Sequence, residues 1–325
     1  MKTLQYREAL IEAMSEEMRK DESVFLLGEE VAEYNGAYKV SQGMLDEFGP
    51  KRIIDTPIAE LGFAGIAVGA SMNGLKPIVE FMTWNFAILA ADQIINSAAK
   101  MLQMSGGQYH CPIVFRGGNG TAGQLAATHS QSFEAFYAHV PGLKVITPSN
   151  PADAKGLLKS AIRDEDPVVF LESEKMYGDK GEVPEGEYLI PIGTASVKRK
   201  GQHVTIVSFG KIIKIAEEVA EILAKENIEI EIIDLRTIRP IDYGTIVESI
   251  KKTNRCVVVE ESWPLASISS EIAYHVQRYA FDHLDAPVLR VTQTDTTFAF
   301  SPTLIEEALP SKEKVIAAIK QVLYA

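Results

Sequence analysis

Cysteine and long hydrophobic runs are scarce in this chain. Its 325 residues include two cysteines, Cys111 and Cys256, which lie far apart and form no C-x-x-C pair. A zinc knuckle or a secreted disulfide framework is therefore not predicted. The uncharged, largely apolar stretch at residues 61–75 is shorter than the ~20 apolar residues that a membrane span needs. These absences favour a protein of a reducing compartment that does not cross a membrane.

Positive charge is also in short supply. The chain has 32 Lys and Arg residues against 44 Asp and Glu residues, for a net charge of -12. This is the wrong sign for neutralising phosphate backbones and argues against a nucleic-acid partner. The first 20 residues mix acids and bases at helical spacing, with Thr3 as the expected N-cap. No signal or transit peptide is indicated, and we expect a cytoplasmic protein.

Short apolar runs that alternate with helical patterns make up most of the sequence. The composition, 46% hydrophobic and 23% charged, is that of a globular protein, and the length corresponds to about two domains. Continuous Val, Ile and Leu runs separated by amphipathic helices indicate parallel sheets covered on both faces. We expect such strands at residues 24–28, 52–55, 77–81, 112–116, 144–148, 167–172, 204–210, 228–235, 255–261 and 287–292.

The pattern breaks once, at residues 177–193. This segment contains four glycines and two prolines, with acidic residues between them and no helical period, as a linker does. The sequence therefore predicts an α/β protein with two parallel-sheet domains, at residues 1–176 and 194–325.

Motifs for nucleotide or zinc binding are weak. Residues 118–123 match G-x-G-x-x-G after a predicted strand, but the next strand ends without the acidic residue that a dinucleotide fold needs for the ribose. No G-x-x-x-x-G-K-[ST] segment is present, which excludes a P-loop, and no histidines are spaced H-x-x-x-H. The residues alone thus favour neither an NAD site nor catalytic zinc.

The positions of Glu60 and His129 in the sequence are compatible with either a structural or a chemical role. Glu60 follows a strand and a Thr-Pro turn and begins a helix of small residues, where an acid is also favoured by the helix N-terminus. His129 follows the glycine-rich loop, where a parallel sheet opens into a crevice, although a lone histidine is more often structural. Gly65 and Gly69 make the helix after Glu60 thin, which allows close packing in the core or between subunits.

Longer segments of the chain resemble one family. They are GEEVAEYNGAYKV (28–40), IIDTPIAELGFAGIAVG (53–69), NSAAKMLQMSGGQ (96–108), ATHSQSFEAFYAHVPGLKVITPS (127–149), DAKGLLKSAIRDEDPVVFLE (153–172) and DLRTIRPID (234–242). In this order, and over essentially the whole chain, they are similar to the beta subunits of pyruvate dehydrogenase, in the thiamine-diphosphate-dependent 2-oxo acid dehydrogenase family. The resemblance implies a pyrimidine-binding domain followed by a transketolase C-terminal-like domain.

The resemblance gives Glu60 a chemical role. In this family the glutamate of the P-[IL]-[AS]-E segment bonds a ring nitrogen of the aminopyrimidine and favours the tautomer that deprotonates the thiazolium carbon. Such a glutamate must hold a proton near neutral pH, so we expect Glu60 to be desolvated. The apolar neighbours Leu61, Phe63 and Ala64 suit this expectation.

The resemblance also implies the rest of the pyrimidine site. Phe86 would stack on the pyrimidine and Met82 would line it. Glu29 would belong to an acidic path between paired active sites. Ile58 and Ala59, directly before the glutamate, would contact the cofactor as well.

Further expectations concern transfer and assembly. His129 matches the family histidine that contacts the substrate carboxylate and assists transfer to a lipoyl group, with Ser130 orienting it. The implied partner is the dihydrolipoamide acetyltransferase core with its lipoyl domain. In relatives a small basic domain of that core grips an acid and the chain terminus, which match Asp285 and Ala325. A structural potassium site is implied at Ile113, Ala161, Ile162, Asp164 and Asp166.

Half of the cofactor site is missing from the sequence. Thiamine diphosphate needs Mg²⁺ on its pyrophosphate, and family members supply it from a G-D-G segment followed by an asparagine. This chain has no G-D-G, and the nearest approach, residues 178–180, lies in the predicted linker. The resemblance therefore implies a separate alpha subunit that holds Mg²⁺ and the pyrophosphate, in an alpha2beta2 tetramer.

The substrate is less determined than the family. The loop at residues 116–131 resembles that of pyruvate enzymes more than that of branched-chain 2-oxo acid enzymes, and acetoin is the third alternative. Much of the substrate pocket would come from another chain. An alternative of another class is a non-catalytic scaffold, but a scaffold needs neither Glu60 nor His129.

Overall fold

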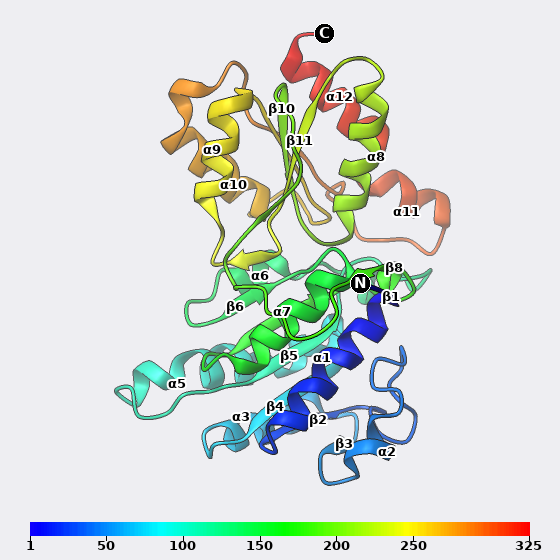
Figure 1. The fold of residues 1–325 in the computed structure, drawn as a ribbon, viewed down its shortest axis with the longest axis vertical. Coiled ribbons are helices and arrows are strands. Elements are labelled where there is room, and N and C mark those ends of the chain that lie inside the picture. Colours follow the sequence, from blue (N-terminus) through cyan, green and yellow to red (C-terminus); the bar gives the residue numbers. More distant parts are fainter.

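The computed structural model describes all 325 residues as two α/β units, one above the other along the long axis of the molecule (Figure 1). The N-terminal unit is built on a sheet of seven strands in the order β12-β6-β7-β5-β4-β2-β3, in which only β12 runs antiparallel to its neighbour. Its strands are β2 (Val24–Gly28), β3 (Ile53–Asp55), β4 (Lys76–Thr83), β5 (Val114–Gly118), β6 (Lys144–Ile146), β7 (Val168–Glu172) and β12 (Thr237–Arg239).

Helices cover both faces of this sheet. One face packs against α1 (Tyr6–Lys20) and α7 (Pro151–Arg163), which also contact each other. The remaining helical elements of this unit lie beside the other face or in its connections. They are α2 (Met44–Phe48), α3 (Glu60–Ser71), α4 (Trp84–Ala87), η1 (Ile88–Ala90), the π-helix η2 (Gln93–Ala98), α5 (Ala99–Met104), η3 (Ala127–His129), α6 (Glu134–Ala138) and η4 (Glu174–Met176).

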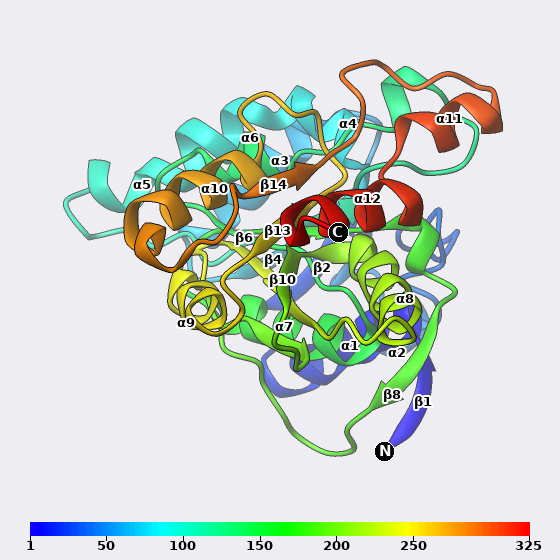
Figure 2. The ribbon, with the colours of Figure 1, turned by 90° about the horizontal axis from the view of Figure 1, so that it is seen from above.

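The C-terminal unit repeats this architecture on a smaller scale. Its five strands lie in the order β14-β13-β10-β11-β9, and only β9 is antiparallel. They are β9 (Ser196–Arg199), β10 (Val204–Ser208), β11 (Ile230–Asp234), β13 (Cys256–Val259) and β14 (Leu289–Val291). The helical elements are η5 (Gly210–Ile212), α8 (Ile213–Ala224), α9 (Tyr243–Thr253), α10 (Ile268–Tyr279), η6 (Phe281–His283), α11 (Pro302–Ala308) and α12 (Lys312–Leu323). Helices α9 and α10 cover one face and α8 and α12 the other (Figures 1 and 2).

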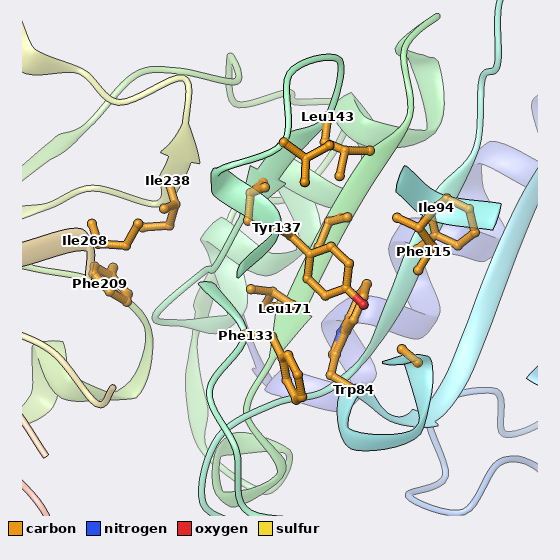
Figure 3. Packing of buried hydrophobic residues seen from close by; sticks show 14 of the residues in the cluster. Trp84, Ile94, Phe115, Phe133, Tyr137, Leu143, Leu171, Phe209, Ile238 and Ile268 are labelled. Atoms are coloured by element: carbon orange, nitrogen blue, oxygen red, sulfur yellow. The ribbon is translucent and has the colours of Figure 1, made fainter. Parts of the chain in front are cut away.

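The two units share a hydrophobic core. Aromatic side chains of the N-terminal unit, including Phe133 and Tyr137, belong to the same buried cluster as Phe209 and Ile268 of the C-terminal unit and Ile238 of β12 (Figure 3). Strand β12 reinforces this connection, because it lies in the C-terminal half of the sequence and pairs with β6. The predicted α/β class with two parallel sheets is confirmed. None of the helices combines the length and apolarity needed to cross a bilayer.

The chain start differs from the prediction. Thr3 lies in β1 (Lys2–Gln5), which pairs antiparallel with β8 (Lys180–Val183) at the edge of the molecule (Figure 2). Helix α1 begins only at Tyr6, and its N-cap is Gln5, so the N-cap predicted at Thr3 is wrong. Residues 2–5 are held as a strand by a partner about 180 residues away, which no local pattern reveals.

Candidate functional site

The residues expected around the pyrimidine follow three neighbouring strands. Glu29 comes directly after β2, Glu60 lies a short turn beyond β3, and Met82 lies near the end of β4, just before Phe86 in α4. Because β3, β2 and β4 are adjacent and parallel, their carboxyl ends lie at one edge of the sheet. This edge is where ligands bind in open α/β sheets.

Glu29 and Glu60 form a buried carboxyl pair. Each side chain belongs to a residue that is only 5% exposed. The pKa of Glu29 is raised to about 7, first by burial, then by the charge of Glu60 and by a hydrogen bond with it. The second oxygen of Glu29, Oε1, is buried and has no hydrogen-bond partner. The pair can therefore hold a proton near neutral pH and present an acceptor to a ligand.

The first turn of α3 explains the position of Glu60. Glu60 is the first residue of the helix, and its N-cap, Ala59, supplies no side-chain cap. A negative charge there is favoured by the helix dipole. Phe63 is buried behind Glu60, as expected, whereas Leu61 is 51% exposed. Ile58 is 82% exposed, so any cofactor contact by Ile58 would be made at the open surface.

Phe86 and His129 lie together although 43 positions separate them. Their rings pack edge to face, with centroids 5.0 Å apart. The hydroxyl beside His129 Nδ1 is Thr128 Oγ1, at 3.0 Å, and not that of Ser130 as expected. Ser130 is buried. Both His129 and Phe86 are half-buried, as is Met82.

Asn85 connects these two segments, and sequence reasoning missed it. Its backbone N–H and its amide Nδ2 donate to Thr83 Oγ1, at 3.3 and 2.8 Å. Its side-chain Oδ1 accepts hydrogen bonds from the backbone and the side chain of Gln131, at 3.1 and 3.2 Å. Asn85 thereby ties the loop that bears His129 to the end of β4. In the sequence, Asn85 is distinguished only by being a polar residue inside an apolar run.

Exposed apolar side chains occur around Glu60 in the sequence and on η1, which contacts α3. They are Ile58, Leu61, Ile66, Ile88 and Leu89. Helix α3 is thin at Gly69, which has open space where a side chain would be. Gly65 instead packs on the side chain of Gln93. Large exposed apolar patches mark interaction surfaces.

The glycine-rich segment after β5 does not form a nucleotide cradle. A Cβ atom on Gly118 would lie 2.6 Å from Glu174 Cγ. Gly120 has φ +77, and a Cβ atom there would lie 2.9 Å from Glu261 Oε1. These glycines are explained by the close approach of the chain's own acidic side chains.

The expected potassium residues lie together, but a side-chain cation already contacts their acids. Lys144 Nζ is 2.7 Å from both carboxylate oxygens of Asp164 and 3.1 Å from Asp166 Oδ2. The Ile113 carbonyl accepts from the Val168 backbone N–H at 2.9 Å. Ala161 and Ile162 are buried nearby in α7. Since Lys144 neutralises the acids, this donor set does not fit a free potassium ion well, and the ion stays a prediction.

The two expected docking residues meet at the far end of the C-terminal unit. The Tyr324 hydroxyl donates to the backbone oxygen of Asp285 at 3.1 Å, which brings the chain end beside it. The carboxylate of Asp285 pairs with Arg255 at 2.9 Å and remains half exposed. Ala325 is exposed.

Comparison with known proteins identifies the family of this chain. The family model "Transketolase, pyrimidine binding domain" matches residues 2–180, and "Transketolase, C-terminal domain" matches residues 193–315. Proteins called pyruvate dehydrogenase E1 component subunit beta are 57% identical in Rickettsia felis (98% of both chains) and 56% identical in Rhizobium meliloti (100% of this chain, 71% of the relative). The mitochondrial protein of that name from Caenorhabditis elegans is 52% identical, over 99% of this chain and 93% of the relative.

The fold is also seen in a solved structure. A split-gene transketolase, described as an inactive beta4 tetramer, superimposes with a TM-score of 0.82 over 99% of this chain and 98% of its own. At 24% identity this likeness shows the shared fold alone.

Proposed function

This chain belongs to the family of pyruvate dehydrogenase E1 component beta subunits, and we propose that it provides the pyrimidine side of a thiamine-diphosphate site for the oxidative decarboxylation of pyruvate. The same site would transfer the acetyl group to the lipoyl group of an acetyltransferase core. The observation that supports this best is the buried pair of Glu29 and Glu60 at the carboxyl edge of the sheet.

The carboxyl pair suits the aminopyrimidine of the cofactor. When bound, thiamine diphosphate supplies the carbanion and electron-sink chemistry. Glu60 would exchange a proton with a ring nitrogen, and Glu29 would keep that proton available, because its pKa of about 7 lies near the operating pH. Phe86 and Met82 would pack against the ring. His129, held against Phe86, would contact the substrate carboxylate.

A separate alpha subunit would complete the site. This chain has no G-D-G segment for the Mg²⁺ that binds the pyrophosphate. The exposed apolar side chains of Leu61 and Ile66 lie in α3, which begins at Glu60, and a partner bound there would also exclude water from the carboxyl pair. Obligate interfaces commonly bury more than ~2,000 Å², so we expect a stable alpha2beta2 complex.

The acetyltransferase core would bind at the opposite end of the molecule. Asp285 and the carboxylate of Ala325 form an acidic end that is separate from the cofactor edge. A small basic domain would be complementary in charge to it.

The decisive experiment is Glu60→Gln in the complex reconstituted with its alpha subunit. The amide keeps the shape but cannot exchange a proton, so we expect pyruvate decarboxylation to fall by about 10²- to 10⁴-fold. Glu33→Gln is the matched control, because Glu33 is exposed in the same region. Near-normal decarboxylation by Glu60→Gln would remove Glu60 from the mechanism.

A titration tests the division of the site between two chains. Thiamine diphosphate and Mg²⁺ are added to the purified chain with and without the alpha subunit, and cofactor binding and turnover are measured. We expect both to require the alpha subunit. Rates with pyruvate, a branched-chain 2-oxo acid and acetoin then distinguish the substrate classes, and decarboxylation by this chain alone would contradict the proposal.

A further inference from the structure

A small polar cavity lies at the junction of the two α/β units. Its volume is about 20 Å³, and its lining includes Asn119, Ser132, Glu134, Ser173, Glu261 and the basic side chain of Lys211. None of the residues expected around the pyrimidine lines it. A cavity of this size accommodates one occupant as large as a water molecule.

Apart from Glu261 Oε2, which lies beside Lys211, three oxygen atoms of the lining residues have no partner, two from residues 132–134 and one from residue 173. They are Glu134 Oε2, Ser132 Oγ and Ser173 Oγ, all buried and all without a hydrogen bond. Glu134 and Ser173 are only 6% and 8% exposed. The other oxygen of Glu134, Oε1, accepts a hydrogen bond from Asn119 Nδ2 at 2.9 Å. Because buried polar atoms are normally bonded, oxygens that surround a void without bonding one another indicate a bound species between them.

The surroundings carry an excess of buried negative charge. Glu261 is compensated, since Lys211 Nζ lies 2.5 Å from its Oε2 and Thr121 donates to its Oε1. Glu260 is fully buried and accepts from the Ser269 backbone N–H. Glu134 forms no ion pair, although Lys211 lines the same cavity and lowers its pKa from a longer distance. In the seven-stranded sheet of the N-terminal unit, Arg116 forms ion pairs with the buried carboxylates of both Glu80 and Glu172.

This charge needs compensation by a proton or by a cation. Burial, followed by the charges of Glu261 and Glu260, raises the pKa of Glu134 to about 8, although Lys211 opposes the shift. A proton on Glu134 would neutralise the carboxylate but would leave the oxygens of Ser132 and Ser173 without partners. A water molecule would bridge the three oxygens but would leave the charge. A single monovalent cation does both, whereas the alternative needs a proton on Glu134 and a water molecule together, and the experiments below distinguish the two.

We propose that this cavity binds one alkali cation through Glu134 Oε2, Ser132 Oγ and Ser173 Oγ. No group of three His, Cys, Asp or Glu residues is arranged to hold a metal, so the site would consist of one carboxylate and two hydroxyls, too little negative charge for a divalent ion. Oxygen ligands with a single free carboxylate suit K⁺ or Na⁺, of whose hydration shell they replace a part. The site is separate from the residues around Asp164, whose acids contact Lys144. The ion would stabilise the junction between the two units, next to the loop that leads to His129.

Anomalous diffraction tests this site directly. Crystals of the complex with its alpha subunit are soaked in Rb⁺ or Tl⁺, and we expect a peak in the cavity of the wild-type protein that is absent in Glu134→Gln. The amide keeps the shape and the hydrogen-bonding capacity of Glu134 while removing its charge. No peak in the wild-type cavity would overturn the proposal and assign the cavity to water or to a protonated Glu134.

Thermal unfolding gives a second, independent reading. At constant ionic strength, KCl or NaCl should raise the melting temperature of the wild-type complex above its value in choline chloride, and Glu134→Gln should lose this rise. Ser173→Ala removes one ligand and should weaken the apparent cation affinity by about tenfold, which keeps the test valid if Glu134→Gln does not assemble. Asp166→Asn is the matched control, and its melting temperature should still rise in KCl or NaCl because Glu134 is intact. A cation effect that is unchanged in both cavity variants, or abolished by Asp166→Asn, would refute the site.

Discussion

Replacing Glu29 by glutamine should stabilise the protein at alkaline pH while impairing catalysis. Burial and the neighbouring charge of Glu60 raise the pKa of Glu29 from 4.5 to about 7. Between these two values the unfolded chain releases the proton while the folded chain keeps it, so the wild-type protein loses stability as pH rises. This difference in pKa lowers the free energy of unfolding of the wild type by at most about 3 kcal/mol, and the loss is complete above about pH 7. Glu29→Gln has no proton to lose and avoids this cost.

The assay compares melting temperatures and turnover of the reconstituted complex at pH 5 and pH 8. We expect the stability of Glu29→Gln relative to the wild type to increase by about 2 kcal/mol or more from pH 5 to pH 8, with pyruvate turnover reduced at both values. Glu30→Gln is the control, because its side chain is exposed and adjacent in sequence. The reasoning is refuted if the stability difference does not change with pH, or if the variant turns over normally.

Three further predictions concern transfer and assembly. His129→Ala should reduce acetyl transfer to lipoyl more than pyruvate decarboxylation measured with an artificial electron acceptor, and equal losses would leave it only a role in pocket shape. Ile66→Asp places a charge on the exposed apolar face of α3 and should weaken association with the alpha subunit by at least about tenfold in a binding titration, whereas Leu304→Asp, also at an exposed apolar position, should not. Residues added after Ala325 should lower the measured affinity for the acetyltransferase core, and unchanged affinity would dispose of the docking proposal.

The parallel strands could be predicted because their signal is local. A strand buried on both faces needs a continuous run of Val, Ile and Leu, and such runs at 204–210 and 255–261 correspond to β10 and β13 within a few residues. The strands at the margins could not be found in this way. β12 contains a single apolar residue, Ile238, and β1 is stabilised by pairing with β8 far along the chain. Their conformation depends on a partner rather than on their own residues.

The residues of the candidate site could be identified from the sequence, but their contacts could not. The resemblance in sequence identified Glu60, Glu29, Phe86 and His129 individually, because motif spacing is written in the chain. Ser130 was assigned a contact that Thr128 makes, since neighbours in sequence point in directions that only the backbone path defines.

The sequence by itself determined the α/β class, the family and the absence of a pyrophosphate motif, since these depend on composition and on continuous segments. Only the tertiary structure decided that Glu29 meets Glu60, that Lys144 neutralises Asp164, and that the oxygens around Glu134 surround a cavity. The physical reason is that burial and charge act through space. A carboxyl group acquires a raised pKa from whichever groups the fold brings near it, and these come from strands that are distant in sequence.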